Sequence, residues 1–377
     1  MHAMQRGLPT ASGGAQILRD EKGGQARACP TLLATVFVAA ATLLATVANA
    51  DEGGVSFWVP GLFGSLAAVP QQPGWSLTTI DYHTSVSAGG AVARAREIEA
   101  ARIPINLSAT LSARLDATAD LLFAIPAYTF ATPILGGQGQ VSMLGAFGRS
   151  VVSVNGLVSG TLTTPLGDIP FSRFDSLRDS VWGFGDLYPM ATLRWNAGVN
   201  NYMTYITGDI PVGAYNPNRL ANIGIGHGTI DGGFGYTYLD PTKGHEFSAV
   251  AGLTYNFINT DTQYRNGVDF HLDWGASQFL TKQLLVGLVG YVYQELGCDS
   301  GSGDRVGCFK SRVISIGPQA GFILPLGKDW QGYFNVKGYG EFDGKNRPDG
   351  VNVWLTFQIS PAAAPPPVTQ TSQMFRK

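Results

Sequence analysis

The sequence has few charged residues, and beyond its N-terminal region it has no long apolar run. Asp, Glu, Lys and Arg make up 14% of its 377 residues, against roughly 25% in an ordinary soluble domain. The net charge of -2 gives no electrostatic basis for binding nucleic acid. After residue 50 no apolar run reaches the roughly 18 residues that a membrane-spanning helix requires. Helical membrane spans are therefore not expected in that part of the chain.

The one continuous apolar stretch is TLLATVFVAAATLLATVANA, from Thr31 to Ala50. Basic residues precede it, and Ala48-Asn49-Ala50 provides small residues at a cleavage site. We expect residues 1–50 to be a secretory signal peptide with an extended N-terminal region. A transmembrane anchor is the alternative.

Cysteine is also scarce, with three residues in the chain. Cys29 lies before the apolar run, whereas Cys298 and Cys308 bracket the loop GCDSGSGDRVGC. A cysteine pair around a short loop of an exported protein favours a disulfide. With no histidine nearby, the pair supplies too few ligands for a metal. We expect a Cys298–Cys308 disulfide, no metal site and no cofactor.

Alternation of apolar and polar residues is abundant. In RIPINLSATLSARL every second residue from Ile103 to Leu115 is apolar, and the residues between them are polar or proline. This is the period of a β-strand with two different faces, sustained for longer than the usual 4–8 residues or so. Similar patterns recur in HEFSAVAGLTYNFIN, VDFHLDWGAS, RVISIGPQAGFILPL and GVNVWLTFQIS.

The connections between these strands alternate in length. LDPTKGHE, FLTKQL and PLGKDW are typical of tight turns, whereas NTDTQYRNG, the cysteine loop and DGKNRPDG indicate longer loops. The pattern predicts an all-β protein, a closed antiparallel transmembrane barrel of about 12 strands (10–14) over residues 74–360. Apolar faces, including that of residues 102–115, would meet lipid and polar faces the lumen. A soluble sandwich or lipocalin-like barrel is the alternative, and a surface with so little charge argues against it.

Several segments resemble a known bacterial family. EGGVSFWVPGLFGSLAAVPQQPGW, GFGDLYP, DIPVGAY and IGPQAGFILPLG are similar to those of the "MetA-pathway of phenol degradation" proteins, over essentially all of residues 51–360. The resemblance implies a transporter-like protein of a Gram-negative outer membrane, associated with uptake of aromatic compounds and without catalytic residues. Its partners would be outer-membrane lipid, the barrel-assembly machinery and small hydrophobic or aromatic molecules. A proline-rich tail over residues 361–377, expected in the periplasm, departs from the usual aromatic end of the last strand.

Titratable residues recur on the polar faces. Asp269, His271 and Asp273 share one face of a predicted strand, and Glu246 belongs to the strand before it. They could bind a cation or a polar substrate group, or simply form a hydrated wall. The other candidates for the lumen are Arg102, Asn106, Arg114 and Arg194.

Residues 51–73 form an apolar segment without alternation, interrupted by prolines. Such a segment does not suit a lipid-facing strand, so we expect a hatch or plug in the barrel, lined by Phe57, Trp58, Leu62 and Phe63. A periplasmic tether is the alternative.

Three classes of function fit these observations. The favoured class is a channel for diffusion of small hydrophobic or aromatic compounds. A structural or adhesive barrel without cargo is the second. A lipid-modifying barrel enzyme is the third, but it needs a serine and a histidine placed together, and no histidine here lies in such a motif. We expect the protein not to be an enzyme.

Overall fold

The computed structural model describes residues 56–89, 109–164, 167–304 and 307–362. The predicted signal peptide (residues 1–50), residues 363–377 of the tail, Arg102 and Asn106 lie outside the described residues. In the described residues every regular element is a strand, and no helix is long and apolar enough to cross a membrane. The strands are β1 (Gly74–Gly89), β2 (Ala109–Thr129), β3 (Gln138–Thr164), β4 (Gly167–Ala197), β5 (Asn200–Asp209), β6 (Thr229–Asp240), β7 (His245–Asn256), β8 (Asp269–Phe279), β9 (Leu284–Glu295), β10 (Arg312–Leu326), β11 (Trp330–Lys345) and β12 (Asp349–Pro361).

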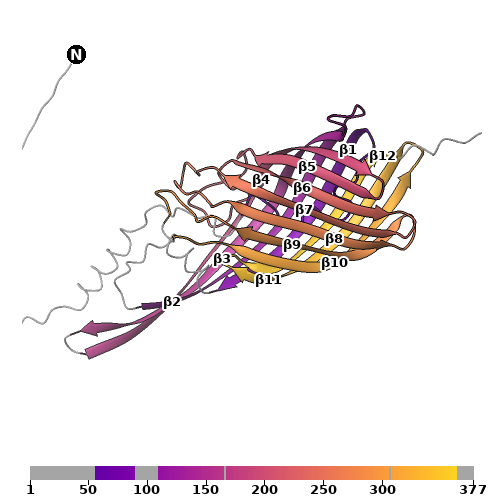
Figure 1. Cartoon of the computed structure of the whole chain (residues 1–377). Coiled ribbons are helices and arrows are strands. Elements are labelled where there is room, and N and C mark those ends of the chain that lie inside the picture. Colours follow the sequence, from indigo (N-terminus) through magenta and orange to yellow (C-terminus); the bar gives the residue numbers. More distant parts are fainter. Residues whose placement is uncertain (1–55, 90–108, 165–166, 305–306, 363–377) are drawn as a thin grey trace, which may run out of the picture. The chain divides into compact units, whose positions relative to one another are not determined.

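The twelve strands form one closed antiparallel barrel (Figure 1). Each strand pairs with the next one in the chain, and β1 closes the sheet against β12, with Leu77 opposite Ile359. Closure gives the backbone groups along both edges a partner, which a sheet surrounded by lipid requires. The predicted fold class and strand number are confirmed.

The connections at the two ends of the barrel differ in length. Residues 198–199, 241–244, 280–283 and 327–329 form short turns at one end, whereas residues 210–228, 257–268 and 296–311 form long loops at the other. In outer-membrane barrels the short turns are periplasmic and the long loops extracellular. The longer loop predicted for DGKNRPDG is wrong, because β11 and β12 extend into this stretch and leave only residues 346–348 as a turn.

The outer surface has the aromatic girdles of a membrane barrel. Trp75, Tyr202 and Trp330 are exposed near the short turns, and Tyr255 and Phe257 are exposed near the long loops. Between them the outward positions are apolar, because the side chains of β-strands alternate between lumen and lipid. This band of apolar side chains places the barrel in the outer membrane.

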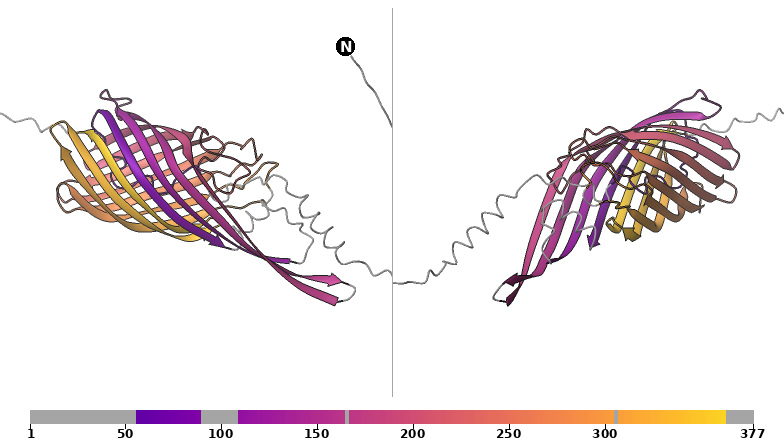
Figure 2. Two further views of the ribbon diagram at one scale, coloured as in Figure 1. Left: turned by 180° about the vertical axis from the view of Figure 1, so that it is seen from behind. Right: turned by 60° about the vertical axis from the view of Figure 1, so that its left-hand side comes forward.

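Strands β3 and β4, of 27 and 31 residues, continue as a hairpin past the ends of the neighbouring strands (Figure 2). On the outer face of β2 and β3, the exposed Leu122 lies opposite the exposed Phe147. Two residues further toward the long loops, the ion pair of His83 and Asp120 begins a polar surface. Further out the outer face carries a second ion pair, Arg114 with Asp116, although exposed Trp182 and Phe174 of β4 lie beside these charges. The charged groups of β2 therefore meet water there.

The orientation predicted for residues 102–115 is wrong where the structure describes it. Leu115 lies on the inner face, 3% exposed, in an apolar cluster with Val154 and Leu220. Arg114 lies on the outer face and pairs with Asp116. This part of β2 extends beyond the membrane, so its polar face turns outward to water and its apolar face packs beneath the loop of residues 210–228.

Candidate functional site

The segment of residues 56–73 lies inside the barrel, where polar side chains of β7 and β8 bind its backbone. Asp273 accepts hydrogen bonds from the amide of Gly61 at 3.0 Å and from that of Phe63 at 3.1 Å. Glu246 accepts one from the amide of Leu66 at 2.9 Å and one from the hydroxyl of Ser65 at 2.5 Å. The segment has no sheet partner of its own, so these carboxylates satisfy backbone groups that would otherwise be buried unpaired.

Strands β4, β6 and β11 bind the same segment. Arg194 donates through Nε to the carbonyl of Ala67 at 3.2 Å, and Thr237 accepts from the amide of Ala68 at 3.0 Å. Lys337 donates to the carbonyl of Gly61 at 2.6 Å. The polar residues of the lumen wall therefore hold the segment in place through bonds to its main chain.

The aromatic side chains of the segment pack on the lumen wall. Trp58, 2% exposed, stacks on His271 with ring centroids 3.7 Å apart and planes 12° apart. His271 in turn lies 2.9 Å through Nε2 from Asp231 and 3.3 Å from the hydroxyl of Tyr205. Phe63 packs on the Tyr205 ring with centroids 5.6 Å apart.

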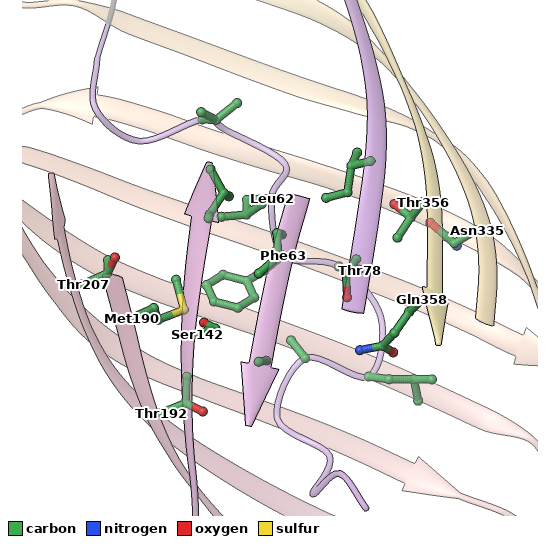
Figure 3. Close-up of a pocket in the computed structure, with 18 of the residues that line it drawn as sticks. Leu62, Phe63, Thr78, Ser142, Met190, Thr192, Thr207, Asn335, Thr356 and Gln358 are labelled. Carbon is green, nitrogen blue, oxygen red and sulfur yellow. The ribbon is translucent and has the colours of Figure 1, made fainter. Parts of the chain in front are cut away.

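Two cavities remain in the lumen beside the segment, lined largely by β1 to β4, with further residues of β5 and of β10 to β12 around the first and of β9 and β11 around the second. The first, of about 260 Å³, is lined by apolar residues such as Ile125 and Leu144 and extends to the polar Gln140. Figure 3 shows Phe63 of the segment facing Ser142 and Met190 across this space. The second cavity, of about 280 Å³, extends toward the long loops. Its lining includes the charged Glu341 and Arg347 and many apolar residues, among them Val86, Leu115, Ala117, Leu121, Phe123, Ala146, Val152 and Leu220.

Four residues line both cavities: Phe57, Trp58, Val59 and Tyr188. The rings of Phe57 and Tyr188 lie 5.4 Å apart, so side chains of the segment and of β4 meet at this boundary. The inner apolar faces of β1 to β4 run past it from one cavity to the other. A few side chains at one level of the lumen therefore separate the two cavities.

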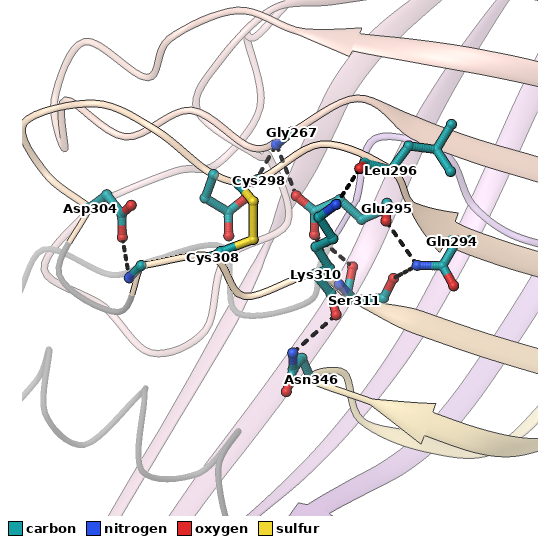
Figure 4. Close-up of a disulfide and its surroundings, with 12 residues drawn as sticks. Gly267, Gln294, Glu295, Leu296, Cys298, Asp304, Cys308, Lys310, Ser311 and Asn346 are labelled. Atoms are coloured by element: carbon teal, nitrogen blue, oxygen red, sulfur yellow. Dashed lines mark hydrogen bonds between the residues drawn. A yellow bond between two sulfur atoms is a disulfide. The ribbon is translucent and has the colours of Figure 1, made fainter.

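The loop of residues 296–311 carries the disulfide expected from the sequence. Cys298 and Cys308 are bonded, with their Cα atoms 4.7 Å apart (Figure 4). At the base of this loop the amide of Gly267 donates to Glu295 at 2.9 Å and to Asp299 at 3.2 Å. Burial and the neighbouring Glu295 raise the pKa of Asp299 to about 7.

The residues predicted to line the lumen do not form a single site in the structure. Glu246, Asp269, His271 and Asp273 are all buried inside the barrel. Asp269 accepts a hydrogen bond from Asn256 at 2.8 Å, and the other three bind the partners described above. Within the described ranges, no three His, Cys, Asp or Glu side chains are grouped so that they could hold a metal ion. Arg114, expected in the lumen, is on the outer face.

The four predicted hatch residues, Phe57, Trp58, Leu62 and Phe63, all line the first cavity. Sequence reasoning missed the contribution of Thr237, Lys337 and Tyr188. It also missed the apolar wall of β1 to β4, because it assigned every apolar face to lipid. The alternation in β2 contained that signal, but alternation alone does not say which face is inside.

Comparison with known proteins identifies the family. The model of a family described as "Putative MetA-pathway of phenol degradation" matches residues 100–357, which is more than half of the chain. The chain belongs to this family. No curated protein matches the sequence.

Solved structures agree with the fold. The crystal structure of an outer-membrane channel from Pseudomonas putida F1 aligns with a TM-score of 0.56 at 13% identity, covering 77% of this chain and 97% of that one. A FadL homologue from Pseudomonas aeruginosa aligns with a TM-score of 0.31 at 9% identity, covering 83% and 97%. The first likeness supports the barrel architecture of this family member, and the second is too distant to support an argument.

Proposed function

We propose that this protein is an outer-membrane channel through which small hydrophobic or aromatic molecules diffuse, and that residues 56–73 form its hatch. The observation that carries the proposal is the pair of cavities in line along the lumen, each with an apolar side and separated by Phe57, Trp58, Val59 and Tyr188. The second cavity lies on the long-loop side and the first on the short-turn side. Together they form an interrupted route through the barrel.

The wall chemistry favours apolar cargo. A hydrophobic molecule gains about 25 cal/mol for each Å² of apolar surface that leaves water. The faces of β1 to β4 that line the cavities present Ile80, Ile125, Leu144 and Phe123. For comparison, a cavity of ~150 Å³ holds benzene, so each space here accommodates one aromatic ring.

The two sides of the segment of residues 56–73 have different contacts, and this difference supports its assignment as a hatch. The carboxylates of Asp273 and Glu246 bind the segment's main chain from one side, and the apolar side chains of the segment face the cavities on the other. A segment held by a few polar contacts can shift without unfolding the barrel. A lipid-modifying enzyme would instead require a serine beside a histidine, whereas His271 contacts Asp231, Tyr205 and Trp58.

Anomalous diffraction from crystals soaked in bromobenzene tests the proposal. We expect bromine in both cavities of the wild-type protein. Leu144→Asp places a charge in the first cavity and should empty that cavity while the second stays occupied. Thr356→Ser, a conservative change in the same lining, should keep both sites occupied. Bromine found only on the lipid-facing surface of folded wild-type protein would contradict the proposal.

A further inference from the structure

The first cavity carries positive charge without a matching negative charge in its lining. Arg194 and Lys337 are among the residues that line it, and no aspartate or glutamate of the described chain is. Lys337 has Asp273 as a charged neighbour behind the hatch. Arg194 is different, because within the described residues it forms no ion pair.

The guanidinium of Arg194 is buried and held in one orientation by hydrogen bonds, but these bonds do not use all of its N–H groups. Its Nη1 donates to Gln140 at 2.9 Å and to Thr192 at 2.8 Å, and its Nε donates to Ala67. Its Nη2 makes no hydrogen bond to any described residue, although the side chain lines the cavity and Arg194 is 7% exposed. Removing a guanidinium from water without a counter-charge costs free energy. An anion in the cavity would supply that charge and accept from Nη2.

The apolar part of the lining lies further along the barrel than Arg194, at the level where Leu144 pairs with Tyr188, and it defines the rest of the ligand. Ile80, Ile125 and Leu144 line it without polar side-chain atoms, and the total volume is about 260 Å³. A cavity of ~150 Å³ is sufficient for one benzene ring. The cavity therefore has room for a ring and one small polar group, with a cation toward one end of the cavity and hydrocarbon toward the other.

We propose that the first cavity is a binding site for a small aromatic monocarboxylate, with its carboxylate on Arg194 and its ring against Ile125 and Leu144. The proposal rests on the proposed channel function and names the cargo class that this cavity prefers. An uncharged aromatic of the same size fills the apolar part but leaves Arg194 without a counter-charge.

Benzoate and benzamide are the probes, because they have nearly the same shape and differ in charge. Calorimetric titration of the protein in nanodiscs should show benzoate binding about tenfold to hundredfold more tightly, the effect of a hydrogen bond to a charged group. Arg194→Gln should abolish this preference, and Arg194→Lys should keep part of it. Arg312→Gln removes the same charge from an exposed ion pair with Asp343 and should change neither affinity.

Two results would overturn the site: equal affinity of the wild-type protein for the two probes, or a benzoate preference that survives in Arg194→Gln. All three variants must first be shown to be folded by their heat-modifiable migration on gels. A different result would show that the proposed channel function is wrong: cells with and without the gene would take up toluene at the same rate. Faster toluene uptake by cells with the gene, together with equal affinities for benzoate and benzamide, would support the channel function and refute the carboxylate site.

Discussion

Replacing Asp273 with alanine should release one half of the hatch. The carboxylate accepts from the amides of Gly61 and Phe63, which lie 212 and 210 positions away in the sequence. Leaving a buried N–H unsatisfied costs about 1–3 kcal/mol, so the loss of both bonds amounts to about 2–6 kcal/mol. That energy shifts the equilibrium between the held and the released segment by about thirtyfold or more.

The contacts that remain in the Asp273→Ala variant determine how much of residues 56–73 is released. Glu246 still holds Ser65 and Leu66, so the part after residue 64 should remain in place. Lys337 keeps its bond to the carbonyl of Gly61 but loses its charged neighbour, which weakens the same region further. Asp273→Asn retains one acceptor oxygen and should have an intermediate effect.

Single-channel conductance in planar bilayers measures the outcome. Deletion of residues 53–70 should give the largest open-channel current, followed by Asp273→Ala, then Asp273→Asn, then the wild type. Asp329→Ala removes an equal charge from an exposed turn and should leave the current unchanged. A folded Asp273→Ala protein with wild-type conductance would refute the role given to this carboxylate. An unchanged current after the deletion would refute the hatch.

The remaining predictions concern the long loop of residues 296–311, which the topology predicts to be extracellular. The disulfide closes a small ring, worth roughly 2–3 kcal/mol, so Cys298→Ser with Cys308→Ser should leave the barrel folded but expose residues 299–307 to protease on intact cells. Cleavage only after the outer membrane is opened would invert the topology. The pKa of Asp299 is raised to about 7, so its protonated form stabilises the loop at low pH, and this contribution declines as pH rises from about 4 through about 7. Hydrogen exchange of the loop, corrected for intrinsic rates, should therefore rise over this interval in the wild type and stay level in Asp299→Asn; a level wild-type profile would contradict the assignment.

The sequence was sufficient to predict the barrel, because a closed sheet in lipid imposes period-two alternation on every strand. In β8 the alternation also gave the correct orientation, with Asp269, His271 and Asp273 inside. In β2 the same reasoning failed at Leu115. Alternation separates two faces, and assigning them requires knowing whether the outer face meets lipid or water at that height.

The contacts that form the candidate site could not be predicted from local pattern. The bonds from Gly61 to Asp273 and from Leu66 to Glu246 join residues about 200 positions apart, and they depend on the register of the whole barrel. The apolar character of residues 57–63 indicated that they do not face lipid as a strand. It did not indicate which wall would hold them or which would be left open.

Uptake of radiolabelled toluene at limiting concentration by otherwise identical cells, with and without the gene, tests the central claim most directly. Intact cells keep the lipopolysaccharide barrier that such a channel would bypass. Channel function predicts a faster initial rate in cells with the gene, and a loss of this gain in the Leu144→Asp variant at equal amounts of folded protein. Equal rates with and without the gene, with folded barrel present in the outer membrane, would contradict it.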